Sequence, residues 1–160
     1  MIRKIVKIGD DVLRKECNPV EKFNLRLQLL LRDMAETMYE ANGVGLAAPQ
    51  VGILRRVAVV DVGDGLLELV NPVITYREGE QKGTEGCLSI PGRQGCVTRP
   101  YKIKVKAQDC KGRFFELEAE EFFARAICHE LDHLDGIMYI DFMDYEIFPE
   151  DEETEEEGEK

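Results

Sequence analysis

The sequence predicts a single folded domain that combines a few helices with many short strands, and three observations support this prediction. Its 160 residues are enough to bury one hydrophobic core, and 44% hydrophobic against 33% charged residues is a globular composition, not a disordered one. Two stretches repeat apolar residues at helical spacing, whereas the middle of the chain consists of short alternating or β-branched runs. Because no internal repeat or linker is found, we expect one domain at residues 1–148 and an acidic tail at residues 149–160.

Each helix is predicted from apolar residues that recur three or four positions apart. The first helix is marked by Leu27, Leu30, Leu31, Met34 and Met38, and we expect Gly43 to end it. The second runs from about Glu120 to Leu134 and ends at Gly136. Its apolar stripe consists of Phe123, Ile127, Leu131 and Leu134.

Strands are predicted in the middle of the chain at residues 56–62, 66–76, 101–109 and 113–119. The segment DCKG joins the last two runs, which indicates a hairpin. Lys102, Lys104 and Lys106 alternate with apolar residues, as on the solvent face of a half-buried strand. These lysines therefore do not indicate a nucleic-acid groove.

The net charge of −11 is concentrated at the end of the chain. Residues 150–160 hold eight acids and one lysine, which leaves 24 acidic (32 less 8) and 20 basic (21 less 1) residues elsewhere. We expect this tail to be solvated and disordered. The five cysteines lack the spacing of a disulfide scaffold, and the charged start offers no signal peptide or membrane span, so we expect a cytoplasmic protein with reduced thiols.

Both histidines of the chain lie within CHELDHLDG, at residues 128–136. Residues four apart stand on one face of a helix, so His129 and His133 can hold one metal ion from a single turn. Glu130 points about a third of a turn away and can reach a water molecule on that metal without being a ligand. This arrangement is typical of hydrolytic His-Glu-x-x-His sites.

A third protein ligand must be a cysteine or a carboxylate, because the chain has no third histidine. Cys128 faces another side of the predicted helix, and Glu150 lies in the acidic tail. Cys87, in TEGCLSIPG, lies between strand-like segments, where a rigid extended loop can present a thiolate. We therefore favour Cys87.

The stretch GVGLAAPQVG, residues 43–52, carries no charge in ten residues. Its glycines and proline predict a loop. Its one amide, Gln50, would suit the wall of a dry site, where it could donate to an oxygen that becomes negative.

Three segments together resemble the ordered signature motifs of the peptide deformylase family: GVGLAAPQ at residues 43–50, EGCLS at 85–89 and HELDH at 129–133. The resemblance extends from the N-terminus to about Tyr145. It implies an α+β fold, in which antiparallel β-sheets pack around a central helix that carries the His-Glu-x-x-His motif. It also implies a catalytic domain whose substrate is the N-formylmethionine of nascent chains, with no membrane partner and only transient proximity to the ribosome.

The resemblance assigns a role to each matching residue. Cys87, His129 and His133 are implied to hold one divalent metal ion, natively Fe(II), with Zn, Ni or Co as replacements. A metal-bound water would attack the formyl carbon, Glu130 would act as general base and then acid, and formate would leave. The side-chain amide of Gln50 and the backbone N–H of Leu88 are implied to hold the formyl oxygen, and Val44 and Gly45 to contact the peptide.

Two other functions use the same motif. A His-Glu-x-x-His endopeptidase would share the metal chemistry without the pairing of Cys87 and Gln50. A structural metal module would need a fourth ligand, such as Cys96 or Cys128.

Asp132, inside HELDH, is predicted to have a structural function. We expect it to pair with a nearby arginine such as Arg99 and not to touch the metal.

Removal of residues 150–160 is expected to leave hydrolysis of a short formyl-methionyl peptide within about twofold, because none of the motifs reaches the tail. Ribosome association should not weaken either, since an acidic segment is repelled by RNA phosphates. Peptide hydrolysis and ribosome co-sedimentation of the truncated protein check both expectations. A large loss in either would show that the tail takes part in function.

Overall fold

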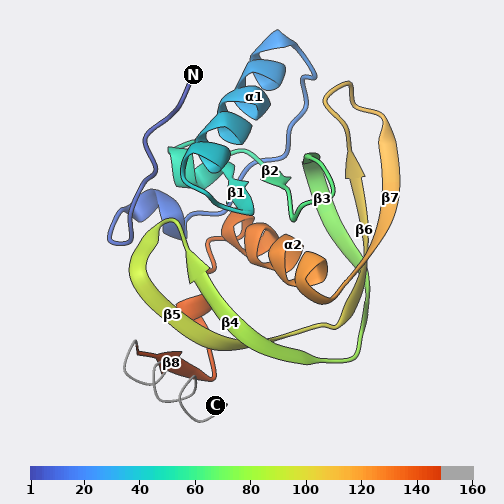
Figure 1. Ribbon diagram of the computed structural model, residues 1–160. Helices are drawn as coiled ribbons and strands as arrows, with labels where there is room; N and C mark the ends of the chain where they lie inside the picture. Colours follow the sequence, from blue (N-terminus) through green and yellow to red (C-terminus); the bar gives the residue numbers. More distant parts are fainter. Residues whose placement is uncertain (149–160) are drawn as a thin grey trace.

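The computed structural model describes residues 1–148, and within them it shows an α+β fold with two antiparallel sheets and two α-helices (Figure 1). This confirms the predicted mixture of helices and strands. The predicted acidic tail at residues 149–160 lies outside the described residues. None of the described helices is long and apolar enough to cross a membrane.

The larger sheet has five strands in the order β1-β2-β3-β6-β7. Its strands are β1 (Gly45–Ala47), β2 (Val57–Val60), β3 (Leu67–Glu78), β6 (Lys102–Gln108) and β7 (Phe114–Glu120). β6 and β7 form the predicted hairpin. Lys102, Lys104 and Lys106 stand opposite Glu120, Glu118 and Glu116 of β7, so the lysine row is neutralised by a row of glutamates.

The smaller sheet has the order β4-β5-β8 and consists of β4 (Gln81–Cys87), β5 (Ile90–Arg99) and β8 (Tyr145–Ile147). The expectation of a loop around Cys87 is wrong: Cys87 ends β4, and a two-residue turn at Leu88 and Ser89 leads into β5. β4 is rich in polar residues and glycine, which have low strand propensity, so hydrogen bonding to β5 and not side-chain preference makes it a strand.

Helix α1 (Leu25–Glu40) covers the larger sheet with the predicted stripe. All five residues of that stripe are buried. The helix ends one residue earlier than Gly43 suggested. Asn42 takes the left-handed conformation (φ 56°), and the N–H groups of Asn42 and Gly43 bond to the carbonyls of Tyr39 and Met38. Three short 3-10 turns complete the described elements: η1 (Asp11–Arg14), η2 (Ala48–Val51) and η3 (Tyr139–Asp141).

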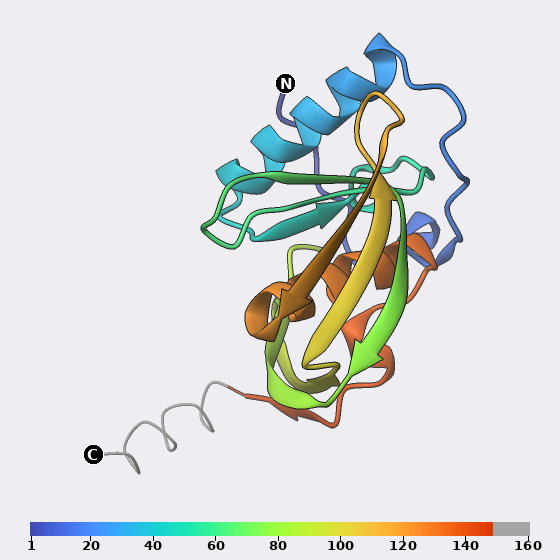
Figure 2. The same ribbon diagram turned by 90° about the vertical axis from the view of Figure 1, so that its right-hand side faces the viewer.

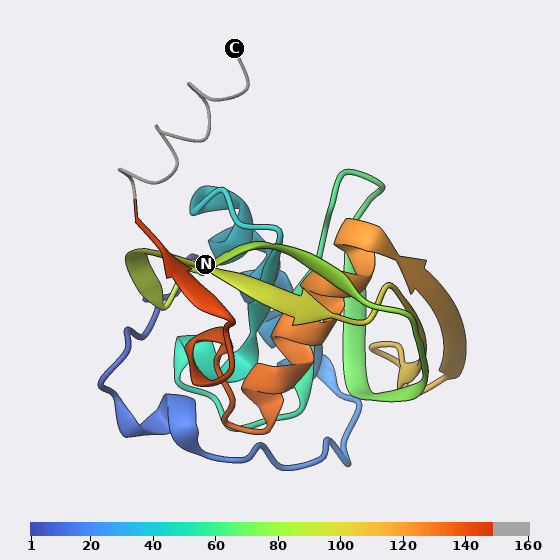
Figure 3. The same cartoon turned by 90° about the horizontal axis from the view of Figure 1, so that it is seen from below.

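Helix α2 (Glu121–Leu134) contacts both sheets: β1, β2, β6 and β7 of the larger one and β5 of the smaller one. Figures 1 and 3 show it running between the β4–β5 hairpin and the larger sheet, and Figure 2 shows the long strands β3 and β6 beside it. Its apolar stripe, including Ile127 and Leu131, packs on the larger sheet. The polar residues His129, Glu130 and His133 are also buried, so the helix is enclosed on two sides.

Gly136 ends α2 as predicted, because it adopts φ 74° just past the helix. The N–H of Gly136 donates a hydrogen bond to the carbonyl of His133, and the N–H of Ile137 donates one to the carbonyl of Asp132. The position is also crowded, since a Cβ atom on Gly136 would lie 2.5 Å from the carbonyl oxygen of Arg14. The N-terminal segment therefore packs directly on this glycine.

Replacement of Gly136 by alanine is expected to destabilise the protein by about 3 kcal/mol or more, because strain at positive φ adds to the overlap with the Arg14 backbone. Gly92 provides a matched control: its φ is 78°, and a Cβ atom there would meet nothing within 4 Å. Gly92→Ala should cost only about 1 kcal/mol. Denaturant unfolding of both variants measures the difference, and equal losses would contradict the packing explanation.

Candidate metal centre and substrate cavity

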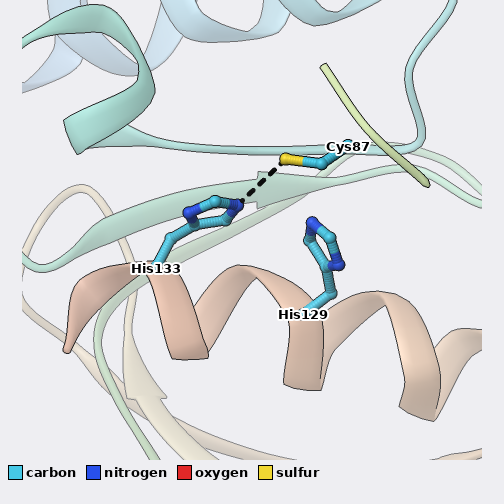
Figure 4. A group of neighbouring side chains, drawn as sticks. All are labelled: Cys87, His129 and His133. Atoms are coloured by element: carbon cyan, nitrogen blue, oxygen red, sulfur yellow. Dashed lines mark hydrogen bonds between the residues drawn. The ribbon is translucent and has the colours of Figure 1, made fainter. Parts of the chain in front are cut away.

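Three side chains that could ligate a metal ion converge between α2 and the end of β4. His129 and His133 rise from successive turns of α2 toward the Cys87 side chain (Figure 4). Their candidate ligand atoms all lie within 4.8 Å of one another, and Cys87 Sγ is 3.3 Å from His133 Nε2. The structure thus brings together the three residues that the sequence predicted as ligands.

The donor set fits a divalent metal ion. One thiolate and two imidazoles are common zinc and iron ligands, and bond lengths of about 2.0–2.3 Å in a tetrahedral site separate neighbouring sulfur and nitrogen atoms by about 3.5 Å. The observed separation of 3.3 Å between Cys87 and His133 is close to this value. Both histidines are buried, and Nδ1 of His129 is already engaged, which leaves its Nε2 for the metal.

The other candidate ligands lie elsewhere. Cys128 is buried in the hydrophobic cluster between α2 and the larger sheet, where burial raises the pKa of its thiol to about 11. Neither Cys96 nor Cys128 belongs to the donor cluster found within residues 1–148. Glu150 lies outside the described residues. In this part of the chain, no fourth protein ligand closes the site, which disfavours a structural metal module.

Glu85 is a residue of the candidate site that was not predicted from the sequence, although it begins the segment EGCLS. Its carboxylate is buried and lies 2.9 Å from His129 Nδ1, so it fixes the ring and its tautomer. Arg99 donates two hydrogen bonds of 2.8 Å to it, and Arg125 donates a third of 2.6 Å. Burial alone would raise the pKa of Glu85, but the bonds from Arg99 and His129 lower it to about 2.

The predicted pairing of Asp132 with Arg99 is confirmed. Nη1 of Arg99 donates to the Asp132 carboxylate at 2.6 Å, and Asp132 does not belong to the donor cluster. Arg99 thus bridges Asp132 on α2 and Glu85 on β4. Its guanidinium is almost fully buried, and the two carboxylates raise its pKa above the ordinary value although burial opposes this.

Glu130 lies beside the three donors and is buried against β1. A Cβ atom at Gly45 would overlap the Glu130 carboxylate, so only glycine allows β1 to pass this close. Within the described chain, Oε1 of Glu130 has no hydrogen-bond partner. Burial raises the pKa of the Glu130 carboxyl to about 7. The carboxyl can therefore hold or release a proton near neutral pH.

The glycines and proline of segment 43–52 predicted a loop, but the segment is not a simple loop. It forms β1, followed by the 3-10 turn η2, which buries Gln50. Oε1 of Gln50 accepts from the Ala47 N–H at 2.9 Å, which orients the amide. Its Nε2 then donates to Ser89 Oγ at 3.1 Å and to the weak acceptor Cys87 Sγ at 3.5 Å.

A cavity of about 320 Å³ opens beside these groups. Its walls include the predicted site residues Val44, Gly45, Gln50, Cys87, Leu88, His129 and Glu130. His133 is fully buried behind them. Leu88 lies in the turn after β4, and its backbone N–H has no acceptor among residues 1–148. The cavity is thus lined by two of the three candidate metal donors, Cys87 and His129, and also by the carboxyl of Glu130 and the N–H donors of Gln50 and Leu88.

Comparison with known proteins gives the same family from a family model and from individual relatives. The family model described as polypeptide deformylase matches residues 2–146. A peptide deformylase of Thermoanaerobacter pseudethanolicus is 59% identical over 140 residues, which is 88% of each chain. One from Clostridium botulinum is 56% identical and covers 88% of this chain and 95% of its own length.

Solved structures agree with the sequence comparison. A peptide deformylase from Thermotoga maritima superposes with a TM-score of 0.88 at 44% identity, covering 89% of this chain and 98% of that one. The enzyme from Synechococcus elongatus, solved in complex with actinonin, gives 0.85 at 40% identity over 88% of this chain and 78% of that one. These similarities do not favour a His-Glu-x-x-His endopeptidase.

Replacement of Asp132 by asparagine should lower the free energy of unfolding by about 1–3 kcal/mol, because buried Arg99 loses one of its two anionic partners. Asp135→Asn is the matched control. Asp135 pairs with Arg56 but is 46% exposed, and such pairs contribute between about 0 and 1 kcal/mol. Urea unfolding compares the two variants. An Asp132→Asn variant as stable as the parent would exclude a structural role for the pairing.

Proposed function

The chain belongs to the polypeptide deformylase family, and from this premise we propose that it removes the formyl group from N-formylmethionyl peptides and releases formate. The observation that carries the proposal is the convergence of Cys87, His129 and His133 beside the buried carboxylate of Glu130. The same cavity presents amide and backbone N–H donors to a carbonyl group that would lie there.

Cys87, His129 and His133 would hold one divalent metal ion, Fe(II) in its native form and Zn, Ni or Co as replacements. When bound, this ion would supply the Lewis acidity that makes water nucleophilic at neutral pH and polarises the formyl carbonyl. A thiolate adds a negative charge that a third imidazole would not, and it makes an Fe(II) site open to oxidation.

Glu130 moves the proton in this proposal. Its buried carboxylate would accept a proton from the attacking water and deliver it to the departing α-amine. Gly45 keeps this part of the cavity wall free of side-chain atoms, so that substrate and carboxylate can approach each other. The family residues carried over to this chain therefore occupy positions where these functions are sterically feasible.

Gln50 and Leu88 would stabilise the negative charge that develops on the formyl oxygen. Sulfur is a weak hydrogen-bond acceptor, so the N–H of Gln50 that contacts Cys87 Sγ can turn to an oxygen placed beside the sulfur. The Ala47 N–H keeps the amide in the required orientation throughout. The free N–H of Leu88 would donate from the neighbouring turn.

The peptide itself would lie along β1. This strand is at the edge of its sheet, so the outer backbone groups of Gly45 can contact an extended chain, and Val44, which precedes the strand, lines the same cavity. In this proposal α2 is the central helix that carries the metal-binding motif. Residues 1–148 form the catalytic domain and act in the cytoplasm on nascent chains, in transient proximity to the ribosome.

Glu130→Gln is expected to retain one metal ion per chain, because Glu130 is not a proposed ligand. Its rate on a formyl-methionyl peptide should fall by about 10² to 10⁴, because the variant cannot accept the proton. Metal analysis and formate release measure the two properties on one preparation. A variant that loses its metal, or that keeps most of its rate, would contradict the proposed role of Glu130.

Cys87→Ala should show the opposite order of effects. Two imidazoles from one helix hold an ion poorly without the third ligand, so the metal should be lost first and activity with it. Dialysis against a weak chelator, followed by metal analysis, compares the variant with the parent protein. Cys96→Ala is the control, since Cys96 is a buried thiol of the same β4–β5 hairpin but lies outside the donor cluster. Equal retention by the Cys87→Ala variant would place the third ligand elsewhere.

A further inference from the structure

The cavity extends along one face of α2 beyond the reacting groups. Its helical wall is made by Phe122, Arg125, Ala126, His129 and Glu130, which share this face because they are three or four residues apart. Arg125 lies one turn before His129, about 6 Å along the helix axis. An unbranched side chain that starts at the reacting end of the cavity can cover this distance.

Arg125 is an unusual residue to line a cavity, because its guanidinium is buried and only some of its N–H groups have hydrogen-bond acceptors. Nη1 donates to Glu85 Oε2 at 2.6 Å and to the Val97 carbonyl at 3.1 Å. Nη2 makes one long contact, 3.5 Å, with the carbonyl of Gln81. Within residues 1–148, the Nε–H and the second Nη2 N–H have no acceptor. A charged group that lines the cavity thus retains unused donors.

Gly83 on β4 allows the guanidinium to lie in this position. A Cβ atom at Gly83 would lie 3.0 Å from Nη2 and 3.2 Å from Cζ of Arg125. The φ of Gly83 is not positive, so the conformation itself does not require glycine. The absence of a side chain at this position therefore leaves room for the flat guanidinium and determines where its free N–H groups lie.

We propose that Arg125, seated on Gly83, is a specificity-determining residue that recognises the thioether sulfur of the substrate's first side chain. This inference rests on the proposed function, because it places formyl-methionine in the cavity. The sulfur is a weak hydrogen-bond acceptor, and it is polarisable, so a charged N–H donor attracts it. A purely aliphatic side chain of the same shape has no hydrogen-bond acceptor for this donor.

Norleucine is the probe, because it replaces the sulfur of methionine by a methylene group and keeps the length of the side chain. The parent protein should favour formyl-methionyl over formyl-norleucyl peptide by about fivefold in kcat/KM. Arg125→Met keeps an unbranched side chain and removes the donors, so the ratio should fall to about one. Because the kcat/KM values for the two peptides are measured on one preparation, their ratio does not depend on how much of the protein is active.

Two further variants separate recognition from structure. Gly83→Ala keeps Arg125 but forces its guanidinium to shift by about a few tenths of an ångström, so its ratio should fall below that of the parent even if Arg125→Met does not fold. Thr84→Val changes a polar residue of the same cavity and leaves Arg125 in place, so its ratio should remain that of the parent. Metal content of each variant is measured in parallel and should be unchanged in Gly83→Ala and Thr84→Val.

The outcomes are distinguishable. A parent protein that hydrolyses both peptides equally well, or an Arg125→Met or Gly83→Ala variant that keeps the full preference, would overturn the inference and leave the proposed function intact. A shift in ratio in Thr84→Val as large as in Gly83→Ala would also overturn it. A parent protein that hydrolyses neither peptide would instead contradict the proposed function.

Discussion

The buried carboxylate of Glu85 is the interaction on which the rest of the site depends. It joins β4 to β5 through Arg99 and to α2 through Arg125 and His129, so three elements from distant parts of the chain meet at one group. A carboxylate in this environment is costly to bury and stable only when its oxygens are fully paired. Here Oε1 accepts from Arg99 and His129, and Oε2 accepts from Arg99 and Arg125. This pairing therefore fixes the position of the hairpin relative to the helix.

That position determines the geometry of the proposed metal site. Cys87 follows Glu85 by two residues on β4, and the register with β5 shifts between them. One short segment thus supplies the donor atom Sγ of Cys87, and the carboxylate of Glu85 in the same segment orients a second donor, His129. Gly45 and Gln50 complete the enclosure from the opposite side, because β1 and η2 approach α2 closely. The donors are consequently held by packed elements and not by loops.

Much of this could be predicted from sequence where the signal is local. The stripes of α1 and α2, the β6–β7 hairpin and the spacing of His129 and His133 each follow from periodicity. The pairing of Asp132 with Arg99 was also predicted. The β4–β5 hairpin was missed because its stability comes from partners far away in the chain, and its residues have weak strand preferences. For the same reason no local pattern indicates that Glu85 and Arg125, which are 40 residues apart in sequence, are buried together.

The metal affinity of Glu85→Gln tests this account most directly. Glutamine keeps the size of the side chain but removes the charge that orients His129 and balances Arg99 and Arg125. Competition with a chelator would give Kd for Co²⁺ or Zn²⁺ in variant and parent, after circular dichroism shows that the variant is folded. The account predicts binding about 10- to 100-fold weaker in the variant. A folded variant with the affinity of the parent would show that the site does not depend on this carboxylate.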